Sequence, residues 1–425
     1  MKQGWEIKKL GEVLVKTETV DPTKKPNDEF IYLDVSSVNK ETKEIENASV
    51  LIGKDAPSRA RKLVRTNDVI FATVRPTHSR VALITEEYDE QVCSTGYFVL
   101  RGKEFIFNQY LFYFLLTDEF NEQMEKLQKG ASYPAVTDAE VKSILLRFPK
   151  SLPEQQRIVA ILDEAFAAID KAKANAEQNL KNAKELFESY LRGVFENPKD
   201  NWEVCNLETN IKLIDYRGRT PVKTENGVRL ITAKNVKLGY LQIEPQEFIE
   251  ENNYKSWMSR GIPNFGDVIF TTEAPLANVA QIDTTEKLAF AQRIIVMQPK
   301  PSKLNQTFLK YMLLSNPIRN KILGKGTGAT VLGIKSSLLK KIEIYFPQSI
   351  LEQQAIVQKL DALSTETKKL EAIYQQKIND LEELKKSILQ KAFAGELRSP
   401  EGAEYTNDVA TPIAKKKTIT NPERA

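Results

Sequence analysis

An internal repeat constrains this chain more than any other feature, because the second half of the sequence resembles the first at an offset close to 198 residues. A shared offset and a shared order indicate two copies of one structural unit, each with a core of its own. A chain of 425 residues is long enough for two or three such domains. The matching segments are 5–7 with 202–204, 67–73 with 266–272, 148–149 with 346–347, and 154–156 with 352–354.

The first part of each copy predicts a globular domain, at 1–150 and at 199–347. Short β-branched runs alternate there with turn residues and a few helical stretches. No regular strand–helix–strand alternation is present, so we expect an α+β fold rather than a doubly wound parallel sheet. The expected elements are strands at 69–74 and 268–272, and helices at 108–129 and 305–323.

The second part of each copy predicts one long helix, at 151–198 and at 348–397, since both segments contain almost no glycine or proline. Apolar residues step by alternating three and four, which is the spacing of a coiled-coil seam. We therefore expect the two helices to pair, with Asn179, Thr367 and Lys377 as polar positions within the seam. The expected seam is Leu162, Ala165, Ile169, Ala172, Ala176, Asn179, Ala183, Leu186 and Tyr190 against Leu360, Leu363, Thr367, Leu370, Tyr374, Lys377, Leu381, Leu384 and Ile388.

Composition narrows the class of protein. The chain has two cysteines and one histidine, which excludes a disulfide framework and leaves little for a structural zinc site. No apolar run approaches the length of a bilayer span, so we expect a cytoplasmic protein with no membrane partner. The tail at 398–425 is polar and contains a run of three lysines, which predicts disorder.

These repeated motifs resemble those of one known family. The motifs are 148–149 through 154–156, the helix ends at 190–195 and 388–397, and the openings at 4–6 and 201–203. In this order, and doubled, they resemble the specificity subunit of type I restriction-modification enzymes. The resemblance covers nearly the whole chain except its tail.

That resemblance implies a function without chemistry in this chain. In the family each globule is a target-recognition domain that reads one half of a split DNA site, and the two long helices pack antiparallel and set the gap between the halves. Two methyltransferase subunits dock on the helices, and restriction and translocase subunits join them. S-adenosylmethionine, ATP and magnesium are used by those partners, so no cofactor is expected here. Because the two globules have diverged, we expect an asymmetric double-stranded DNA site.

Local charge agrees with a DNA-binding role. The whole chain carries only +4, whereas 54–80 holds seven basic residues against two acidic ones, and 217–237 holds six against one. Basic groups bind phosphates, while Arg reads guanine and Asn or Gln reads adenine. The alternative for each residue is an ordinary solvated surface charge. The predicted DNA-binding residues are Ser58, Arg59, Arg61, Arg75, His78 and Arg80 in the first half, and Arg217, Arg219, Thr220, Lys234, Asn235 and Arg293 in the second.

Four of the conspicuous residues have their own interpretation. Arg75 precedes Pro76, which favours an extended backbone and a well-held side chain. His78 is the only histidine, and no Ser–His or metal-binding set accompanies it. Asp68 and Asp267 stand at equivalent places before strands, where a turn role is favoured over catalysis.

Known catalytic motifs are not found. The segment 328–336 approaches a phosphate-binding loop, but Ile334 interrupts the Gly-Lys pair that such loops need. The methyltransferase tetrapeptides Asn-Pro-Pro-Tyr and Asp-Pro-Pro-Tyr do not occur. Two other hypotheses remain open: a coiled-coil adaptor that recruits partners without reading DNA, and an enzyme that acts alone.

Overall fold

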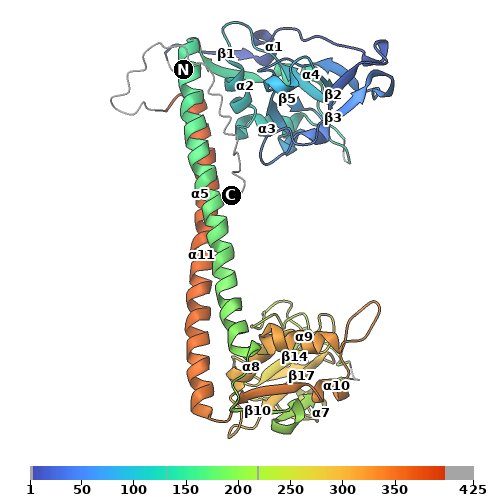
Figure 1. Cartoon of the computed structure of the whole chain (residues 1–425), viewed down its shortest axis with the longest axis vertical. Coiled ribbons are helices and arrows are strands. Elements are labelled where there is room, and N and C mark those ends of the chain that lie inside the picture. The colour runs from blue at the N-terminus through green and yellow to red at the C-terminus, as the bar shows by residue number, and fades with distance from the viewer. Residues whose placement is uncertain (1–2, 131, 218–219, 398–425) are drawn as a thin grey trace, which may run out of the picture. The chain divides into compact units, whose positions relative to one another are not determined.

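The fold follows the repeat. The computed structural model describes residues 3–130, 132–217 and 220–397. Met1–Ala172 with Asp380–Ala425 form one unit, and Lys173–Asn379 form the other. Each unit contains one globule and a part of both long helices, α5 (Leu152–Glu196) and α11 (Ile350–Ala394) (Figure 1). The predicted tail at 398–425 lies outside the described residues.

The first globule holds two sheets and a terminal ribbon. In the central sheet, β5 lies between β6 and β8, and all pairs are antiparallel. The second sheet has the order β3-β2-β7-β4, in which β2 and β7 run parallel. The strands are β1 (Trp5–Lys9), β2 (Glu29–Leu33), β3 (Ser49–Ile52), β4 (Ala60–Leu63), β5 (Val69–Ala72), β6 (Val81–Leu83), β7 (Val92–Ser94), β8 (Tyr97–Leu100) and β9 (Leu145–Pro149).

The second globule repeats this plan. β14 lies between β15 and β17, with β11 added at the edge, and β12 pairs in parallel with β16. The ribbon β10–β18 corresponds to β1–β9, and the last strand of each ribbon leads directly into a long helix. The strands are β10 (Trp202–Asn206), β11 (Ile211–Asp215), β12 (Val228–Ile231), β13 (Phe248–Ile249), β14 (Val268–Thr271), β15 (Val279–Gln281), β16 (Leu288–Phe290), β17 (Ile294–Pro299) and β18 (Glu343–Pro347).

Each of the two helices expected in the globules is broken into two. Residues 108–129 form α2 (Asn108–Phe114) and α3 (Asp118–Leu127), and 305–323 form α8 (Gln306–Leu314) and α9 (Asn316–Gly324). The Thr117 hydroxyl donates to the carbonyl of Phe114, and Ser315 does the same to Met312. A hydroxyl that bonds the preceding turn competes with the helix, and this is why periodicity alone missed the break. The other helices are α1 (Leu10–Val13), α4 (Asp138–Ser143), α6 (Leu207–Asn210), α7 (Tyr254–Trp257) and α10 (Ser336–Lys340).

Buried glutamines attach each globule to the long helix that follows it. The Gln155 side chain accepts from the Phe107 amide at 2.9 Å and donates to the carbonyl of Pro149 at 2.9 Å and of Phe105 at 3.0 Å. Gln353 makes the same three bonds, to residues 305, 347 and 303. Both side chains are fully buried.

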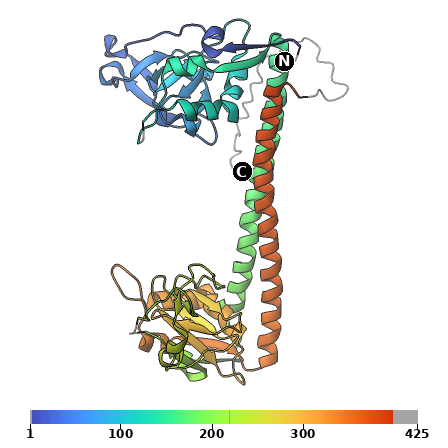
Figure 2. The same ribbon diagram turned by 180° about the vertical axis from the view of Figure 1, so that it is seen from behind.

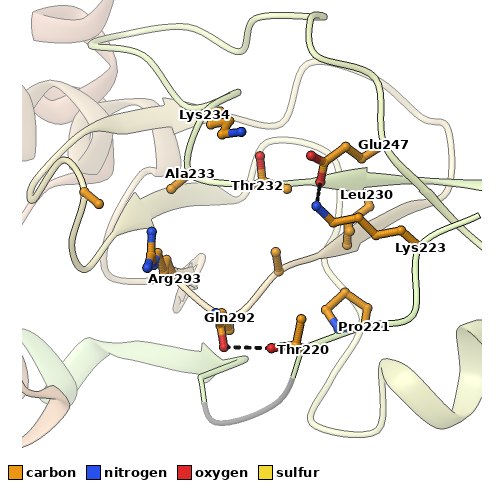
Figure 3. Close-up of a pocket in the computed structure, with 12 residues that line it drawn as sticks. Thr220, Pro221, Lys223, Leu230, Thr232, Ala233, Lys234, Glu247, Gln292 and Arg293 are labelled. Atoms are coloured by element: carbon orange, nitrogen blue, oxygen red, sulfur yellow. Dashed lines mark hydrogen bonds and ion pairs between the residues drawn. The ribbon is translucent and has the colours of Figure 1, made fainter.

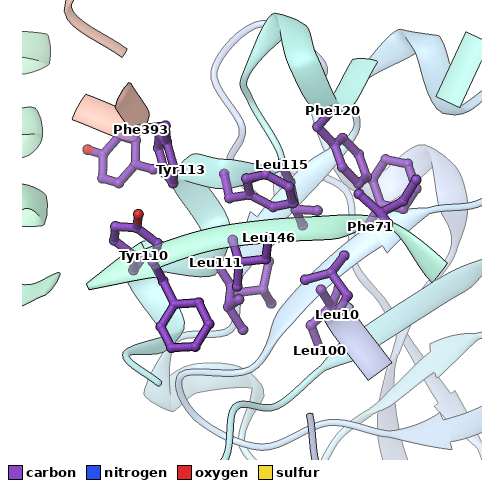
Figure 4. Packing of buried hydrophobic residues seen from close by; sticks show 14 of the residues in the cluster. Leu10, Phe71, Leu100, Tyr110, Leu111, Tyr113, Leu115, Phe120, Leu146 and Phe393 are labelled. Atoms are coloured by element: carbon purple, nitrogen blue, oxygen red, sulfur yellow. The ribbon is translucent and has the colours of Figure 1, made fainter. Parts of the chain in front are cut away.

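The end of the other long helix closes each globule. Phe393 of α11 lies 4.8 Å from the Tyr110 ring in the first core, and Phe195 of α5 lies 5.3 Å from Phe308 in the second. Figure 4 shows Phe393 beside Tyr110 and Tyr113 in the first core. In each unit the start of one helix therefore packs beside the end of the other, so they run antiparallel, as both views show for the first unit (Figures 1 and 2). The expected antiparallel helix pair is confirmed.

The buried stripe of each helix departs from the predicted seam. After Ala176 the stripe continues through the buried Ala183 and Leu191 and the half-buried Leu180 and Phe187, while Asn179 is exposed, and so are Leu186 at 49% and Tyr190 at 39%. In α11 the stripe passes through Thr367, as predicted, but then through Ile378 and not Lys377 or Leu384. This is the spacing of a straight helix, 3.6 residues per turn, whereas the prediction used 3.5. Within the described residues, no helix is long and apolar enough to cross a membrane.

Candidate nucleic-acid interface

One corner has the same backbone frame in both globules. It lies where the central strand, β5 or β14, ends beside the turn that precedes β8 or β17. The Thr73 amide donates to the carbonyl of Gly96 at 2.8 Å, and the Thr272 amide donates to that of Arg293 at 3.0 Å. We call residues 73–75 with 95–96 the first corner, and 272–274 with 292–293 the second corner.

A hairpin loop backs each corner. The carbonyl of Thr73 accepts from the Val136 amide at 2.9 Å, and that of Thr272 accepts from Ile334 at 3.0 Å. The loops turn at Gly130 (φ 102°) and Gly328 (φ 129°), a backbone conformation that favours glycine. At Gly328 a Cβ would stand 2.1 Å from the carbonyl oxygen of Val331. The glycine-rich segment at 328–336 therefore begins as a turn against the corner.

Arg75 is the most prominent side chain of the first corner. It is exposed, and its guanidinium lies 5.3 Å from the ring centre of Tyr133, which is itself exposed. The expected extended backbone is wrong: Arg75 is left-handed, with φ 50° and ψ 58°. Its amide donates to the carbonyl of Pro134 at 2.7 Å, and Pro76 begins the 3-10 turn Pro76–His78 directly after it. This tertiary bond and the turn override the local preference of a residue before proline.

The other first-half candidates fall into two groups. Ser58, Arg59 and His78 are exposed, and the carbonyl of Arg59 accepts from the Thr95 amide at 2.8 Å, which places Arg59 beside the corner. Arg61 and Arg80 are half-buried. Arg61 lies 3.5 Å from the Asp21 carboxylate, and Arg80 donates to the carbonyl of Val38, so both side chains hold their own globule together.

Three second-half candidates meet at one cavity of about 280 Å³ beside the second corner, lined by Thr220, Lys234 and Arg293 together with Gln292 (Figure 3). The Thr220 hydroxyl donates to the Gln292 side-chain oxygen at 3.3 Å. The guanidinium of Arg293 lies 2.9 Å from the Glu273 carboxylate, and both side chains are nearly half exposed. Lys234 is exposed at the rim.

The remaining second-half candidates differ from these. Arg217 binds Asp215 at 2.5 Å and donates to the carbonyl of Ile334 at 3.1 Å. This contact with Asp215 raises the pKa of Arg217 above its usual value, so the charge is engaged inside the globule. Asn235 is fully buried, and its amide bonds Thr232 and three nearby carbonyls, so it organises a turn and is not presented to a ligand. Arg219 lies outside the described residues.

Sequence reasoning missed Gln292 and Glu273 in the second corner and Thr95 in the first. None of these residues lies in the two basic segments that guided the search, and the strand pairing that brings them to the corner joins positions that are far apart in the sequence, such as Ala72 with Tyr97 and Thr271 with Ile294. The repeat contained the necessary signal. Aligning strand β8 with β17 pairs Thr95 with Gln292, and both residues then precede the strand that pairs with the central strand.

The paired aspartates are structural. Asp68 is buried and accepts two bonds from Arg101, at 2.7 and 2.8 Å, and one from the Arg65 amide at 2.8 Å. Asp267 is equally buried and accepts from Gln298 at 2.6 Å and from Gln306 at 3.0 Å. Both carboxylates are satisfied at the start of a buried strand, in agreement with the expected turn role.

Comparison with known proteins places this architecture in a family. The model of the type I restriction modification DNA specificity domain matches residues 2–181 and 217–383. The chain belongs to this family. It is therefore a specificity subunit of the type I class, which is not an enzyme in its own right, as the resemblance of its motifs implied.

Relatives and solved structures agree with this assignment. The specificity subunit of the MjaVIII enzyme of Methanocaldococcus jannaschii is 25% identical over 68% of this chain and 70% of its own length. The match to the HindI specificity subunit of Haemophilus influenzae, also 25% identical, spans 39% of this chain but only 33% of that protein. A chain from a structural study of complex assembly and conformational transition in the type I R-M system is 27% identical, with a TM-score of 0.79, and the match covers 93% of this chain and 99% of that one.

Proposed function

We propose that this specificity subunit reads an asymmetric, bipartite DNA site, one half with each globule, through the two corners. The observation that supports this most directly is the repetition of one backbone frame with an arginine in it, Arg75 in the first globule and Arg293 in the second. Arginine is the residue that most often reads a guanine edge, and neighbouring cations supply affinity for phosphates.

Nearby exposed cations fit the same role. Arg59 stands beside the first corner and Lys234 beside the second, and neither has an ion-pair partner among the described residues. Arg61, Arg80 and Arg217 are engaged within the protein and are left out of the proposed DNA surface. In this proposal the exposed residues of the corners contact the bases, and the basic groups around them contact the phosphates.

The long helices complete the proposal. We propose that α5 and α11 set the distance between the half-sites and carry the docking surfaces for two methyltransferase subunits, with restriction and translocase subunits joining that core. Methyl transfer from S-adenosylmethionine and ATP-driven, magnesium-dependent steps would belong to those partners. A helix of 45 residues rises about 68 Å, which is of the order of two turns of DNA.

The test is a map of methylated adenines in the genome of a host. One strain makes this chain with its companion methyltransferase, and a second makes the methyltransferase alone. A new split motif with two unlike halves, present only with this chain, is the expected result. If a soluble, stable complex adds no new methylation, DNA reading is wrong and the adaptor hypothesis replaces it.

A further inference from the structure

We infer that four paired positions of the two corners determine which bases each globule reads: Val74 with Glu273, Arg75 with Ala274, Thr95 with Gln292, and Gly96 with Arg293. The inference rests on the proposed function, and it adds the residues that specify sequence. It starts from a contrast between a backbone that is kept in both globules and side chains that are not.

The backbone of the two corners shares several hydrogen bonds, although the Ala274–Pro275 peptide bond is cis and the Arg75–Pro76 bond is not. Besides the amide bonds of Thr73 and Thr272 described above, isolated bridges join 74 to 135 and 273 to 333 at equivalent places. Even the unusual left-handed backbone is shared, with φ 50° at Arg75 and φ 48° at Ala274. A side chain at any of these positions therefore starts from a similar backbone in both globules.

Residues that build the frame are alike in both copies. Thr73 and Thr272 are both buried, and each hydroxyl donates to the carbonyl across the corner, at 3.0 and 3.4 Å. Pro76 and Pro275 both follow the left-handed residue. The scaffold is thus kept where it holds the backbone.

The four paired positions differ in chemistry at every pair, and of these residues only Gly96 is buried. The first corner offers one guanidinium, from Arg75, with no carboxylate bound to it among the described residues, beside the small Thr95 and Gly96. The second corner offers an amide from Gln292 and a guanidinium from Arg293 that is paired with Glu273 at 2.9 Å. A frame kept for geometry, with side chains changed in hydrogen-bonding pattern, is what two readers of different base sequences require.

Base preferences follow from these groups. Arg75 fits a guanine in the first half-site, and Gln292 fits an adenine in the second. Glu273 holds the Arg293 guanidinium in place through their ion pair. Its negative charge repels a phosphate or a guanine edge unless that group replaces the carboxylate as the partner of Arg293.

The structure also says in which direction side chains can be exchanged. A Cβ at Gly96 would stand 2.6 Å from a methyl group of Val35, so an arginine there must displace its neighbour. The reverse exchange only removes bulk at that position, and the left-handed backbone at 274 matches the one that carries Arg75. The second corner can therefore receive the side chains of the first.

The experiment is methylome mapping with a fourfold variant, Glu273→Val, Ala274→Arg, Gln292→Thr and Arg293→Gly. The half-site read by the second globule should change at one or more base pairs, while the first half-site and the spacer stay as they were. An unchanged second half-site, methylated as fully as before, overturns the inference. A change in both halves overturns it too.

A single substitution keeps the inference testable if the fourfold variant is unstable, and a matched control shows whether any effect is specific to the corner. If the fourfold variant does not accumulate, Gln292→Thr alone should lower discrimination at one base pair of the second half-site by roughly tenfold or more, and an unaltered motif overturns the inference. Lys287→Ala removes another exposed ion pair of the same globule, 2.6 Å from Glu251 at the opposite end of β16, and should leave the motif unchanged. The unmodified chain must first yield a split motif, and failure at that step refutes the proposed function itself.

Discussion

At the scale of single residues, the two buried glutamines show how much one side chain can fix. The Glu-Gln-Gln motif marks the start of each long helix in the sequence, but it does not say which glutamine matters. Gln155 and Gln353 are fully buried, whereas Gln156 and Gln354 are exposed. Each buried amide satisfies one backbone N–H and two carbonyls, one of them at the last residue of the strand that leads into the helix.

Replacing Gln155 with Ala should therefore lower the free energy of unfolding by about 2–4 kcal/mol, because it leaves three buried backbone groups without partners. The measurement is urea unfolding of the full chain. Gln156→Ala is the matched control one residue along the same helix, and it should change stability by less than about 0.5 kcal/mol. Equal effects from the two substitutions would contradict the proposed role of Gln155 in attaching the globule to the helix.

A second residue-scale prediction concerns Lys43. Its ammonium group is half-buried and donates to the carbonyl of Ser79 at 2.7 Å and to that of Lys40. Burial lowers its pKa to about 8, against the attraction of Glu41 and with help from the nearby charges of Lys385 and Arg80.

The folded-state pKa of Lys43 lies below its unfolded value, so protonation favours the unfolded chain. Stability from this group is therefore fully present above about pH 10.5, and it is lost as the pH falls towards 8. The expected gain between pH 8 and 10.5 is of the order of 1 kcal/mol after screening. Lys43→Met should flatten that rise in urea unfolding curves, while Lys40→Met, at an exposed neighbour, should not. Parallel curves for wild type and Lys43→Met would refute it.

At the scale of elements, the buried positions of the long helices distinguish a repeat of 3.5 residues from one of 3.6 residues. The two repeats cannot be told apart over a short stretch of sequence. A 3.5-residue step puts Leu384 in the seam and Ile378 outside it, and a 3.6-residue step does the reverse. Ile378 is 8% exposed and Leu384 is 46% exposed. The drift occurs at equivalent places in both helices, so it belongs to the repeat.

Truncation of these two side chains gives opposite expectations under the two spacings. Ile378→Ala should cost about 2–4 kcal/mol, as for a buried aliphatic side chain, and Leu384→Ala should cost less than about 1 kcal/mol. Thermal unfolding of the two variants beside the wild-type chain is the measurement. A larger loss from Leu384→Ala would restore the heptad interpretation.

The sequence predicted elements better than it predicted the corner. The repeat, the α+β class, the central strands and the long helices all follow from patterns that are local or that recur. The breaks at Thr117 and Ser315 do not, because a hydroxyl that bonds the previous turn leaves the apolar periodicity intact. Gln292 and Glu273 join the corner only through strand pairing, and the left-handed backbone of Arg75 depends on a hydrogen bond to Pro134. Both features depend on contacts between residues far apart in the sequence, so local patterns do not predict them.

At the scale of the whole molecule, the repeat gives the two globules one plan and two long helices that belong to both units. The boundary between the units falls within each helix, after Ala172 and after Asn379. Residues can be added at these two points without entering the contacts of either globule. In the proposed function the globules recognise the half-sites and the helices set the distance between them. This can therefore be tested by changing the length of the helices alone.

Insertion of seven helix-forming residues at both points should lengthen the spacer of the recognised site and leave its half-sites unchanged. Seven residues rise about 10.5 Å and return the buried stripe to within about 20° of its direction. DNA rises about 3.4 Å per base pair, so the methylated motif should gain about three base pairs between its halves. The same insertion in α5 alone puts the two helices out of register, and it should abolish methylation at both spacings. An unchanged spacer in the doubly extended chain would show that the helices do not set the distance, and altered half-sites would show that they do more than measure it.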